Sequence, residues 1–242
     1  MKGFGRYVIF LSSLVVRRET FKTYYNLTLE ECVQIGLKSI LLFMLVSTFM
    51  GAVTTLQTGA NLVSPFVPRF IISNVVREMT ILELAPTIMA VIYAGKVGSS
   101  MAGGLGTMRI TEQIDALEVM GINSASYLVL PKIVASILMY PLLVIVAAVC
   151  ALMGGYLVGT LTGLLTPTEY VYGIRYAFNP YFITFALIKT FVFAFLISTI
   201  SSFKGYFTQG GALEVGIAST QAVTSSIIAI LLADYFLAYL LI

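Results

Sequence analysis

Residues 127–165 read YLVLPKIVASILMYPLLVIVAAVCALMGGYLVGTLTGLL, in which Lys132 is the single charged residue. A helix needs about 20 predominantly apolar residues to cross a bilayer, so this stretch predicts a membrane span long enough to tilt or to extend beyond the membrane. The whole chain shares this character, since 59% of its 242 residues are hydrophobic and 10% are charged, whereas about 25% are charged in a soluble domain. We therefore expect an all-α integral membrane protein.

Five hydrophobic stretches predict five transmembrane helices, and the stretch quoted above is the third. They are expected at residues 38–60, 81–103, 127–165, 181–203 and 217–242. With a cytoplasmic N-terminus, ten Lys and Arg residues fall on the cytoplasmic side, and Arg69, Arg77 and Arg175 fall outside. Because positive charge accumulates in cytoplasmic loops, this distribution predicts that the N-terminus is inside and the C-terminus outside. The connections at 104–132 and 204–216 are then cytoplasmic, and those at 65–68 and 165–180 are external.

The N-terminal region is expected to lie on the membrane rather than to cross it. Its apolar run, residues 7–16, is shorter than a span and has basic residues on both sides, which is typical of a helix in the membrane interface. Arg17-Arg18-Glu19 stands where a signal peptide would have its small-residue cleavage site, so no cleavage is expected. We predict a single domain over residues 1–242, with an interfacial region at 1–33 and a transmembrane core at 34–242.

Missing residue types exclude several functions. The chain has no histidine, and Cys32 and Cys150 fit no metal-binding spacing, so we expect no metal and no cofactor in this chain. A net charge of +3 offers no basic surface to nucleic acid. Lys96 is followed by Val97 rather than by Ser or Thr, so the phosphate-loop pattern is absent and the chain cannot hydrolyse ATP by that route.

The odd number of expected spans indicates whether one copy of the chain could form a transport path by itself. Five spans without an internal repeat argue against a self-sufficient secondary transporter, which usually carries paired repeats around a central site. Five helices also enclose little space. A transport path would therefore need a second copy of the chain.

Residues 106–121, GTMRITEQIDALEVMG, form a polar segment between long hydrophobic stretches. Its apolar residues recur at helical spacing and its three acids stand three apart on another face. The apolar set is Ile110, Ile114, Leu117 and Met120, and the acids are Glu112, Asp115 and Glu118. We expect a short amphipathic helix on the cytoplasmic surface, with Thr111 as N-cap and Gly121 just after the C-cap. It is either an ordinary polar helix between spans or a docking helix for a groove in a cytoplasmic partner.

Small residues recur at helical spacing in two places and predict close helix packing. Gly95, Ser99 and Gly103 share one stripe, and Gly98, Ala102 and Gly106 share another. In the third expected span, Gly155, Gly159 and Gly163 form two overlapping G-x-x-x-G units.

Glu83 is the unusual residue of the second expected span. An acid within a span costs on the order of 3 kcal/mol, so Glu83 should face a cavity, a partner or the water at the outer end. Pro86, three residues on, is expected to bend the helix and to free a backbone carbonyl near the acid. Thr54, Thr55 and Gln57, near the outer end of the first span, are candidates to line the same cavity.

Two further charged residues fall within the last two expected spans. Lys189 is expected to extend its ammonium group towards the membrane surface, and Asp234 is expected to reach the outer interface, since it lies eight residues from the C-terminus.

These residues together closely resemble the MlaE-type ABC permease family. The matching segments are 83–86 (ELAP), 93–99 (YAGKVGS), 106–121, Pro131-Lys132, Gly205-Tyr206 and 233–236 (ADYF), and the resemblance covers roughly residues 29–242. It implies a half-transporter for lipids that works as a homodimer with two cytoplasmic ABC ATPase subunits and an external MCE-domain substrate-binding protein. Such a complex moves phospholipid between the inner membrane and the outer envelope of double-membraned bacteria. The chain itself would be no enzyme, because ATP and Mg²⁺ would be used by the partner ATPase.

The resemblance also implies roles for particular residues. Residues 107–121 match the coupling helix that contacts the ATPase, which assigns that contact to Arg109, Glu112, Gln113, Asp115, Leu117 and Glu118. In the family the lipid cavity lies between two copies near the first, second and fifth spans, and by position Gln57 and Glu83 match polar residues there; Thr54 and Leu84 are further candidates for it.

The sequence departs from the family pattern at two positions. The family often has Arg at position 82 and Glu at position 104, where this chain has Leu82 and Gly104. Arg77, six residues before Glu83, is the candidate replacement for the missing arginine.

Two other classes of function remain alternatives. The first is a membrane scaffold that assembles peripheral proteins without transporting anything. The second, an intramembrane enzyme, is disfavoured because the chain has no histidine and no paired carboxylates in one span.

Overall fold

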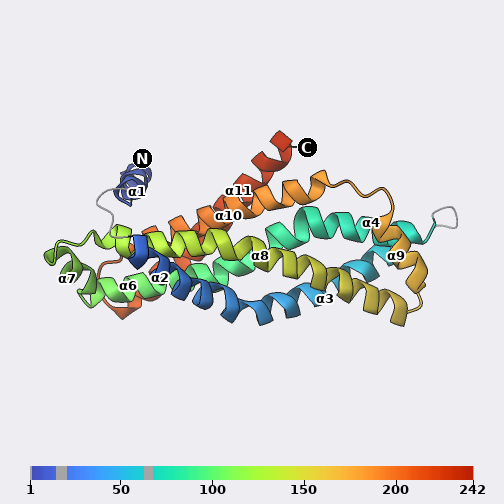
Figure 1. Ribbon diagram of the computed structural model, residues 1–242, viewed down its shortest axis with the longest axis horizontal. Coiled ribbons are helices and arrows are strands. Elements are labelled where there is room, and N and C mark those ends of the chain that lie inside the picture. The colour runs from blue at the N-terminus through green and yellow to red at the C-terminus, as the bar shows by residue number, and fades with distance from the viewer. Residues whose placement is uncertain (1, 15–20, 63–67, 242) are drawn as a thin grey trace.

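The computed structural model describes residues 2–14, 21–62 and 68–241, and every regular element in these ranges is a helix (Figure 1). The α-helices are α1 (Lys2–Ser13), α2 (Phe21–Cys32), α3 (Lys38–Asn61), α4 (Phe70–Met79), α5 (Met89–Tyr93), α6 (Ser99–Ile110), α7 (Gln113–Val119), α8 (Ser124–Leu161), α9 (Pro167–Arg175), α10 (Tyr181–Tyr206) and α11 (Ala212–Leu241). Three π-helical segments join some of them: η1 (Val33–Leu37), η2 (Thr80–Ile88) and η3 (Ala94–Gly98). The all-α prediction is thus confirmed for the described residues. The expected external residues 65–67, and the basic residues Arg17 and Arg18, lie outside these ranges.

Within the described residues, four helices are long and apolar enough to cross a membrane, which confirms a multi-pass membrane protein. They are Lys22–Asn61, Ser124–Leu161, Tyr181–Tyr206 and Ala212–Leu241. The first begins well before the expected residue 38, because α2 and η1 continue into α3 without a break. The expected span at 81–103 is not among the four. It lies in a helical run from residue 70 to 110 that η2 and η3 interrupt, so the count of five spans remains a prediction.

The helices form one elongated bundle (Figure 1). Helix α8 packs along α3 and also against α2 and α10, and α10 in turn packs against α6 and α11. Helix α7 lies at one end of the bundle, and α4 and α9 pack together at the other. The run from α4 to α6 therefore passes from one end of the molecule to the other.

The α3–α8 contact depends on glycines that bring the two backbones together. A Cβ atom on Gly51 would lie 1.8 Å from the Ala151 carbonyl oxygen, and one on Gly154 would lie 2.1 Å from the Thr48 carbonyl oxygen. Gly155, predicted as a packing residue, would bring a Cβ to 2.5 Å from the Thr55 hydroxyl. A side chain at any of these positions would push the helices apart, so the predicted close packing is present, although Gly51 and Gly154 were not singled out by the sequence pattern.

Of the other predicted packing glycines, two are in close contact with a neighbouring helix and one is not. A Cβ on Gly98 would meet the Ser201 hydroxyl at 2.8 Å, and one on Gly159 would meet the Thr55 methyl at 3.3 Å. Gly95 does not serve this purpose within one chain, because it is exposed and no described atom lies within 4 Å of its Cβ position. The stripe that contains Gly95 faces outwards there, which periodicity alone cannot reveal.

The end of the bundle opposite α7 is fixed by polar contacts. Thr166 caps α9 in a capping box with Glu169, and the Thr166 backbone N–H and hydroxyl lower the pKa of the Glu169 carboxyl below its ordinary value. Arg77 of α4 is buried and donates hydrogen bonds to the carbonyl oxygens of Ile174 and Tyr176, at 2.7 and 2.8 Å. These bonds join α4 to α9 and set the direction in which the run to α6 begins.

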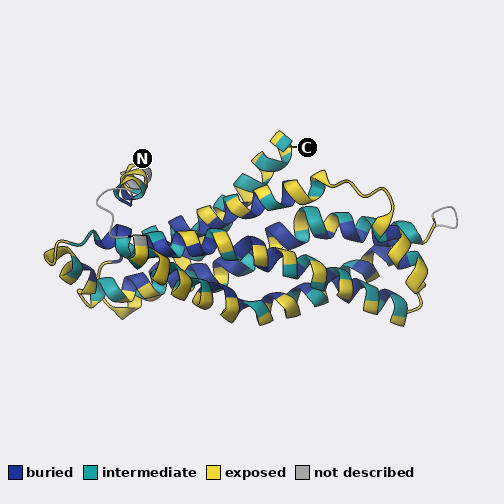
Figure 2. Ribbon diagram, in the orientation of Figure 1, coloured by how far each residue is buried: buried dark blue, intermediate teal, exposed yellow. Residues whose placement is uncertain are grey.

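Exposed residues lie along the outer side of the bundle helices (Figure 2), and many of them are large and apolar. In the most apolar 18-residue stretch of helix Tyr181–Tyr206, 50% of the residues are buried, whereas in that of Ala212–Leu241 only 11% are. Helix α11 therefore has the least cover from its own chain, and its apolar side chains require lipid or another protein.

Candidate functional site

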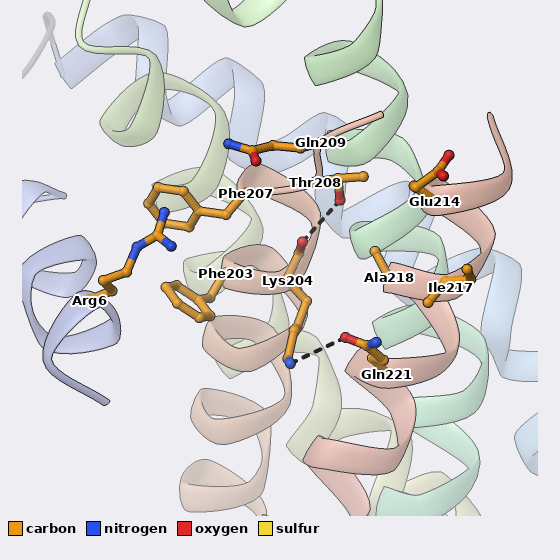
Figure 3. A pocket seen from close by; sticks show the side chains of 10 residues that line it. All are labelled: Arg6, Phe203, Lys204, Phe207, Thr208, Gln209, Glu214, Ile217, Ala218 and Gln221. Atoms are coloured by element: carbon orange, nitrogen blue, oxygen red, sulfur yellow. Dashed lines mark hydrogen bonds between the residues drawn. The ribbon is translucent and has the colours of Figure 1, made fainter. Parts of the chain in front are cut away.

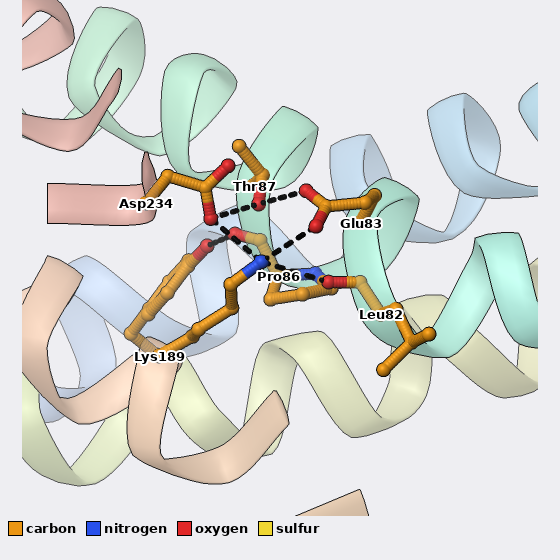
Figure 4. Close-up of polar contacts among 7 residues, drawn as sticks. Leu82, Glu83, Pro86, Thr87, Lys189 and Asp234 are labelled. Carbon is orange, nitrogen blue, oxygen red and sulfur yellow. Dashed lines mark hydrogen bonds and ion pairs between the residues drawn. The ribbon is translucent and has the colours of Figure 1, made fainter. Parts of the chain in front are cut away.

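A cluster of charged side chains from three elements lies inside the bundle (Figure 4). Lys189 of α10 is fully buried, and its Nζ atom lies 2.8 Å from Oε1 of Glu83 in η2 and 2.6 Å from Oδ1 of Asp234 in α11. We call Glu83, Lys189 and Asp234 the charged triad. A lysine removed from water in this way is stabilised only when opposite charges and hydrogen bonds surround it.

Pro86 supplies a further partner for Lys189. In an α-helix, the Leu82 carbonyl would accept a hydrogen bond from the N–H of residue 86, but proline has none. Lys189 Nζ donates to that carbonyl oxygen instead, at 3.1 Å. The Pro86 carbonyl oxygen accepts a bond of 2.6 Å from the Tyr140 hydroxyl of α8. A backbone carbonyl near the acid thus has a side-chain partner, and Pro86 lies within the π-helical segment η2, where the regular α-helix is broken.

The triad is open on the side of Glu83. The side chains of Lys189, Asp234 and Glu83 are 0%, 18% and 48% exposed. The Thr87 hydroxyl lies 3.0 Å from Glu83 Oε2 and 3.2 Å from Asp234 Oδ1, and it can donate to one of them at a time. Two acids against one lysine leave a net negative charge, so the triad presents a carboxylate, backed by a buried cation, to whatever lies outside.

Two expectations about this region were wrong. Lys189 does not extend towards the membrane surface, and Asp234 does not reach the outer interface, because each neutralises the other within the bundle. The signal that could have joined them is that intramembrane charges usually pair with one another. With Glu83, the expected second, fourth and fifth spans each supply one charge, which together make the triad.

Of the other residues predicted for a lipid cavity, Leu84 is half-buried and follows Glu83 in η2, whereas the rest lie apart from the triad. Arg77 does not replace the missing arginine, since it is committed to α9 and to an ion pair with Glu78 at 3.0 Å. Thr55 is buried at the α3–α8 contact and so cannot line a cavity. Gln57 is exposed on α3. The Thr54 hydroxyl donates to the Met50 carbonyl oxygen. None of the described contacts joins Thr54 or Gln57 to the triad.

The polar segment at residues 106–121 is built differently from the single helix expected. Helix α6 continues to Ile110, Thr111 is its C-cap, and Glu112 takes a left-handed conformation with φ of 60° before α7 begins. The expectation that Thr111 is an N-cap was therefore wrong. Gly121 does end the helix as expected, with φ of 80°, and the bonds from Gly121 to Glu118 and from Ile122 to Leu117 form a Schellman motif.

Two of the three acids of this segment have partners inside the chain. Arg109 donates to Asp115 across a distance of 2.6 Å. Glu118 Oε1 accepts bonds from the hydroxyls of Ser124, at 2.8 Å, and Tyr206, at 3.0 Å. Ile114, on the inner face of α7, is fully buried. These contacts fix α7 firmly against the start of α8 and the end of α10.

The remaining side chains of the segment point away from the bundle. Glu112 and Gln113 are exposed, and Glu112 forms no ion pair with any described residue. Val119 and Met120, at 89% and 65% exposure, are apolar and uncovered, whereas Leu117 is half-buried. Met120, which the sequence places on the apolar face with Ile114, is thus exposed, whereas Ile114 is buried.

A hollow of about 310 Å³ lies beside α1, between the ends of α10 and α11 (Figure 3). The Arg6 guanidinium lies over the Phe207 ring at 4.9 Å, and Lys204 Nζ lies 3.5 Å from the Gln221 side-chain oxygen. Tyr7 of α1 donates to Thr199 of α10 at 2.7 Å. Contacts with α10 thus hold α1 against the α7 end of the bundle.

Comparison with known proteins places the chain in a family. The family model described as Permease MlaE matches residues 28–240. A probable ABC transporter permease protein of Rickettsia bellii is 35% identical over 236 residues, which cover 98% of this chain and 91% of that protein. A probable ABC transporter permease protein of Synechocystis is 32% identical, covering 88% of this chain and 81% of that protein.

A plant protein is similar over nearly the whole chain as well. Protein TRIGALACTOSYLDIACYLGLYCEROL 1, chloroplastic, of Arabidopsis thaliana is 34% identical over 238 residues, which cover 95% of this chain and 65% of that protein. With the four apolar helices, these matches identify a transport subunit rather than an enzyme. The chain is a multi-pass membrane protein that belongs to the MlaE permease family.

Proposed function

We propose that this chain is the membrane subunit of an ABC transporter that moves phospholipid between the inner membrane and the outer envelope of a bacterium. Two copies would form the transport path. A separate ABC ATPase dimer, which uses ATP and Mg²⁺, would bind at the α7 end in the cytoplasm, and an MCE-domain protein would bind at the opposite, external end, formed by α4 and α9. The family assignment supports the permease role, and one relative is named after a glycerolipid.

The observation that carries the proposal is the connection between α7 and the charged triad. One helical run, residues 70–110, holds Glu83 and ends at the two-residue turn before α7. Arg109 and the contacts of Glu118 fix α7 to that run and to its neighbours. A partner that displaces α7 would therefore move the run that carries Glu83, as a coupling helix must do.

The lipid would be held where Glu83 is exposed. A headgroup would meet the Glu83 carboxylate beside Leu84, with Thr54 and Gln57 of α3 further along the proposed cavity, and its acyl chains would lie on the exposed apolar surface of α3 and α11. Burial of each methylene group contributes about 0.8 kcal/mol. Release therefore requires the apolar surface to close, and movement of α7 through the run at 70–110 would supply that closure.

Charge reversal at Glu112 tests the proposal. Asp115 and Glu118 stabilise α7 itself, whereas Glu112 has no ion pair in the described chain, so Glu112→Lys alters the docking surface and spares the fold. We expect Glu112→Lys to weaken retention of the ATPase by about tenfold, the effect of about 1.4 kcal/mol, and to lower ATP-dependent transfer of fluorescent phospholipid between liposomes. Glu30→Lys, the same change at an exposed acid of α2, is the matched control. Full retention and full transfer in Glu112→Lys would contradict the proposal.

A non-transporting scaffold is the alternative, and it needs the exposed face of α7 but no lipid site. Lipid that copurifies with the intact complex in stoichiometric amounts, and is lost in Glu83→Gln, would exclude the scaffold. Copurification of lipid that is indifferent to residue 83 would favour it.

A further inference from the structure

A second polar site lies between α3, α6 and α8, in the half of the bundle that carries α7. It is a cavity of about 200 Å³ whose lining includes Lys38, Lys96 and Lys132. We call it the three-lysine cavity. It is separate from the charged triad, none of whose members line it.

The charges of the three-lysine cavity are not balanced within the chain. Lys132 forms an ion pair with Glu31, the one acid of the lining. Lys38 Nζ donates to the Gln34 side-chain oxygen at 2.5 Å, and Lys96 Nζ donates to the Lys38 backbone carbonyl. Neither Lys38 nor Lys96 has an ion pair among the described residues. Two uncompensated ammonium groups thus meet in one concave site, where apolar walls strengthen their attraction for an anion.

A buried hydroxyl in the same cavity also has no partner. Ser39 is fully buried and lines the cavity, and its Oγ atom makes no hydrogen bond to any described residue. Burial of a hydroxyl without a hydrogen bond is unfavourable, so an anion held by the lysines would satisfy it. Ser39 therefore points to a ligand independently of the lysines.

The backbone around the three-lysine cavity is irregular on two sides. Gln34 belongs to η1 and Lys96 to η3, so two of the three π-helical segments meet at this cavity. Single π-helical turns within α-helices occur frequently at functional sites. Each shifts the side chains that follow it around the helix.

We propose that the three-lysine cavity binds the phosphate group of an anionic phospholipid from the surrounding leaflet. Lysine binds phosphate as a point charge, and basic pockets between membrane helices bind lipid headgroups. Beside the cavity, Leu37 and Leu41 are 59% and 76% exposed and offer an apolar surface for acyl chains. The bound lipid would tie α3, α6 and α8 together near α7. The inference does not rest on lipid being the transported substrate.

The test compares lipid binding to variants of the full chain in nanodiscs. The nanodiscs contain phosphatidylcholine with or without phosphatidylglycerol, and native mass spectrometry counts the phosphatidylglycerol that stays bound after release into detergent. We expect Ser39→Ala and Lys96→Gln each to lower the affinity for phosphatidylglycerol about tenfold. Lys204→Gln is the matched control, since it removes the same charge at the same end of the bundle but outside the cavity. The inference would be overturned if Ser39→Ala and Lys96→Gln bound phosphatidylglycerol as well as the wild type does.

Ser39→Ala separates ligand binding from a structural effect. If Ser39 served only the fold, loss of an unsatisfied hydroxyl would leave lipid binding unchanged and would keep or raise the thermal stability. A free anion is distinguished in the arm without phosphatidylglycerol, where inorganic phosphate is the probe. If inorganic phosphate raised the thermal stability of the wild type in pure phosphatidylcholine, and failed to do so for Ser39→Ala, the site would belong to a soluble anion and the lipid assignment would be overturned.

Discussion

Lys189 is the residue at which three membrane elements are joined. It receives an acid from η2 and another from α11, and its ammonium also lies 4.8 Å from the centre of the Phe185 ring. Removal of one member of a buried ion pair is usually more harmful than removal of the whole set, because the remaining charges stay buried without compensation. The half-exposed Glu83 can recover some hydration, but Asp234 at 18% exposure cannot do so fully.

Replacement of Lys189 by Met should therefore destabilise the protein strongly. We expect a loss of about 3–5 kcal/mol in Lys189→Met, and a clearly smaller loss in the triple variant Glu83→Gln, Lys189→Met, Asp234→Asn, in which no charge is left unpaired. Calorimetric unfolding in detergent measures both. The control, Lys204→Met, removes a half-buried lysine without an ion pair among the described residues and should cost less than about 1 kcal/mol. A triple variant no more stable than Lys189→Met would show that the charges do not compensate one another.

At the scale of elements, the long apolar helices could be predicted from the sequence, whereas the turn before α7 could not. Apolar composition alone predicts spans at 127–165 and 181–203, close to α8 and α10 in the structure, because lipid leaves the backbone few alternatives to helix. The left-handed Glu112 and the π-helical segments escape such reasoning, since apolar composition and spacing do not distinguish a π-helical turn from an α-helical one or mark a positive φ at a non-glycine residue. The triad escapes as well, because spacing along one helix does not tell which neighbouring helix supplies the partner.

Gly51 tests how closely α3 and α8 must approach. A methyl group at this position would overlap the Ala151 carbonyl oxygen of the opposing backbone, which cannot rotate away. We expect Gly51→Ala to cost at least about 1–3 kcal/mol and to lower the yield of monodisperse protein in detergent, as measured by size-exclusion chromatography and thermal unfolding. Gly104→Ala is the matched control, because no described atom lies within 4 Å of its Cβ position and Ala is the better helix former. If both variants behaved alike, the helices would not be held at this distance.

At the scale of the whole molecule, the uneven cover of the spanning helices indicates where a second copy would bind. Half of the most apolar stretch of α10 is buried by its own chain, whereas only 11% of that of α11 is, although α11 packs on α10, α6 and the run from η2 to η3. Asp234 lies on the covered face of α11, so this helix contributes one member of the triad on one side and is uncovered on the other. A second copy on α11 would thus place the two triads on either side of one path, as the proposed transport requires.

Cysteine crosslinking along α11 tests this arrangement in native membranes. In a variant without Cys32 and Cys150, single cysteines at Tyr235 and Tyr239, which are 67% and 81% exposed, should form disulfide-linked dimers under mild oxidation. These positions are four residues apart and share a helical face, so crosslinking should fall at the positions between them and recur with helical periodicity. Leu41→Cys, on α3 and 76% exposed, is the control for random collision. Equal crosslinking at residue 41 and along α11 would mean that the copies meet without a fixed interface, and α11 would then face lipid on its uncovered side.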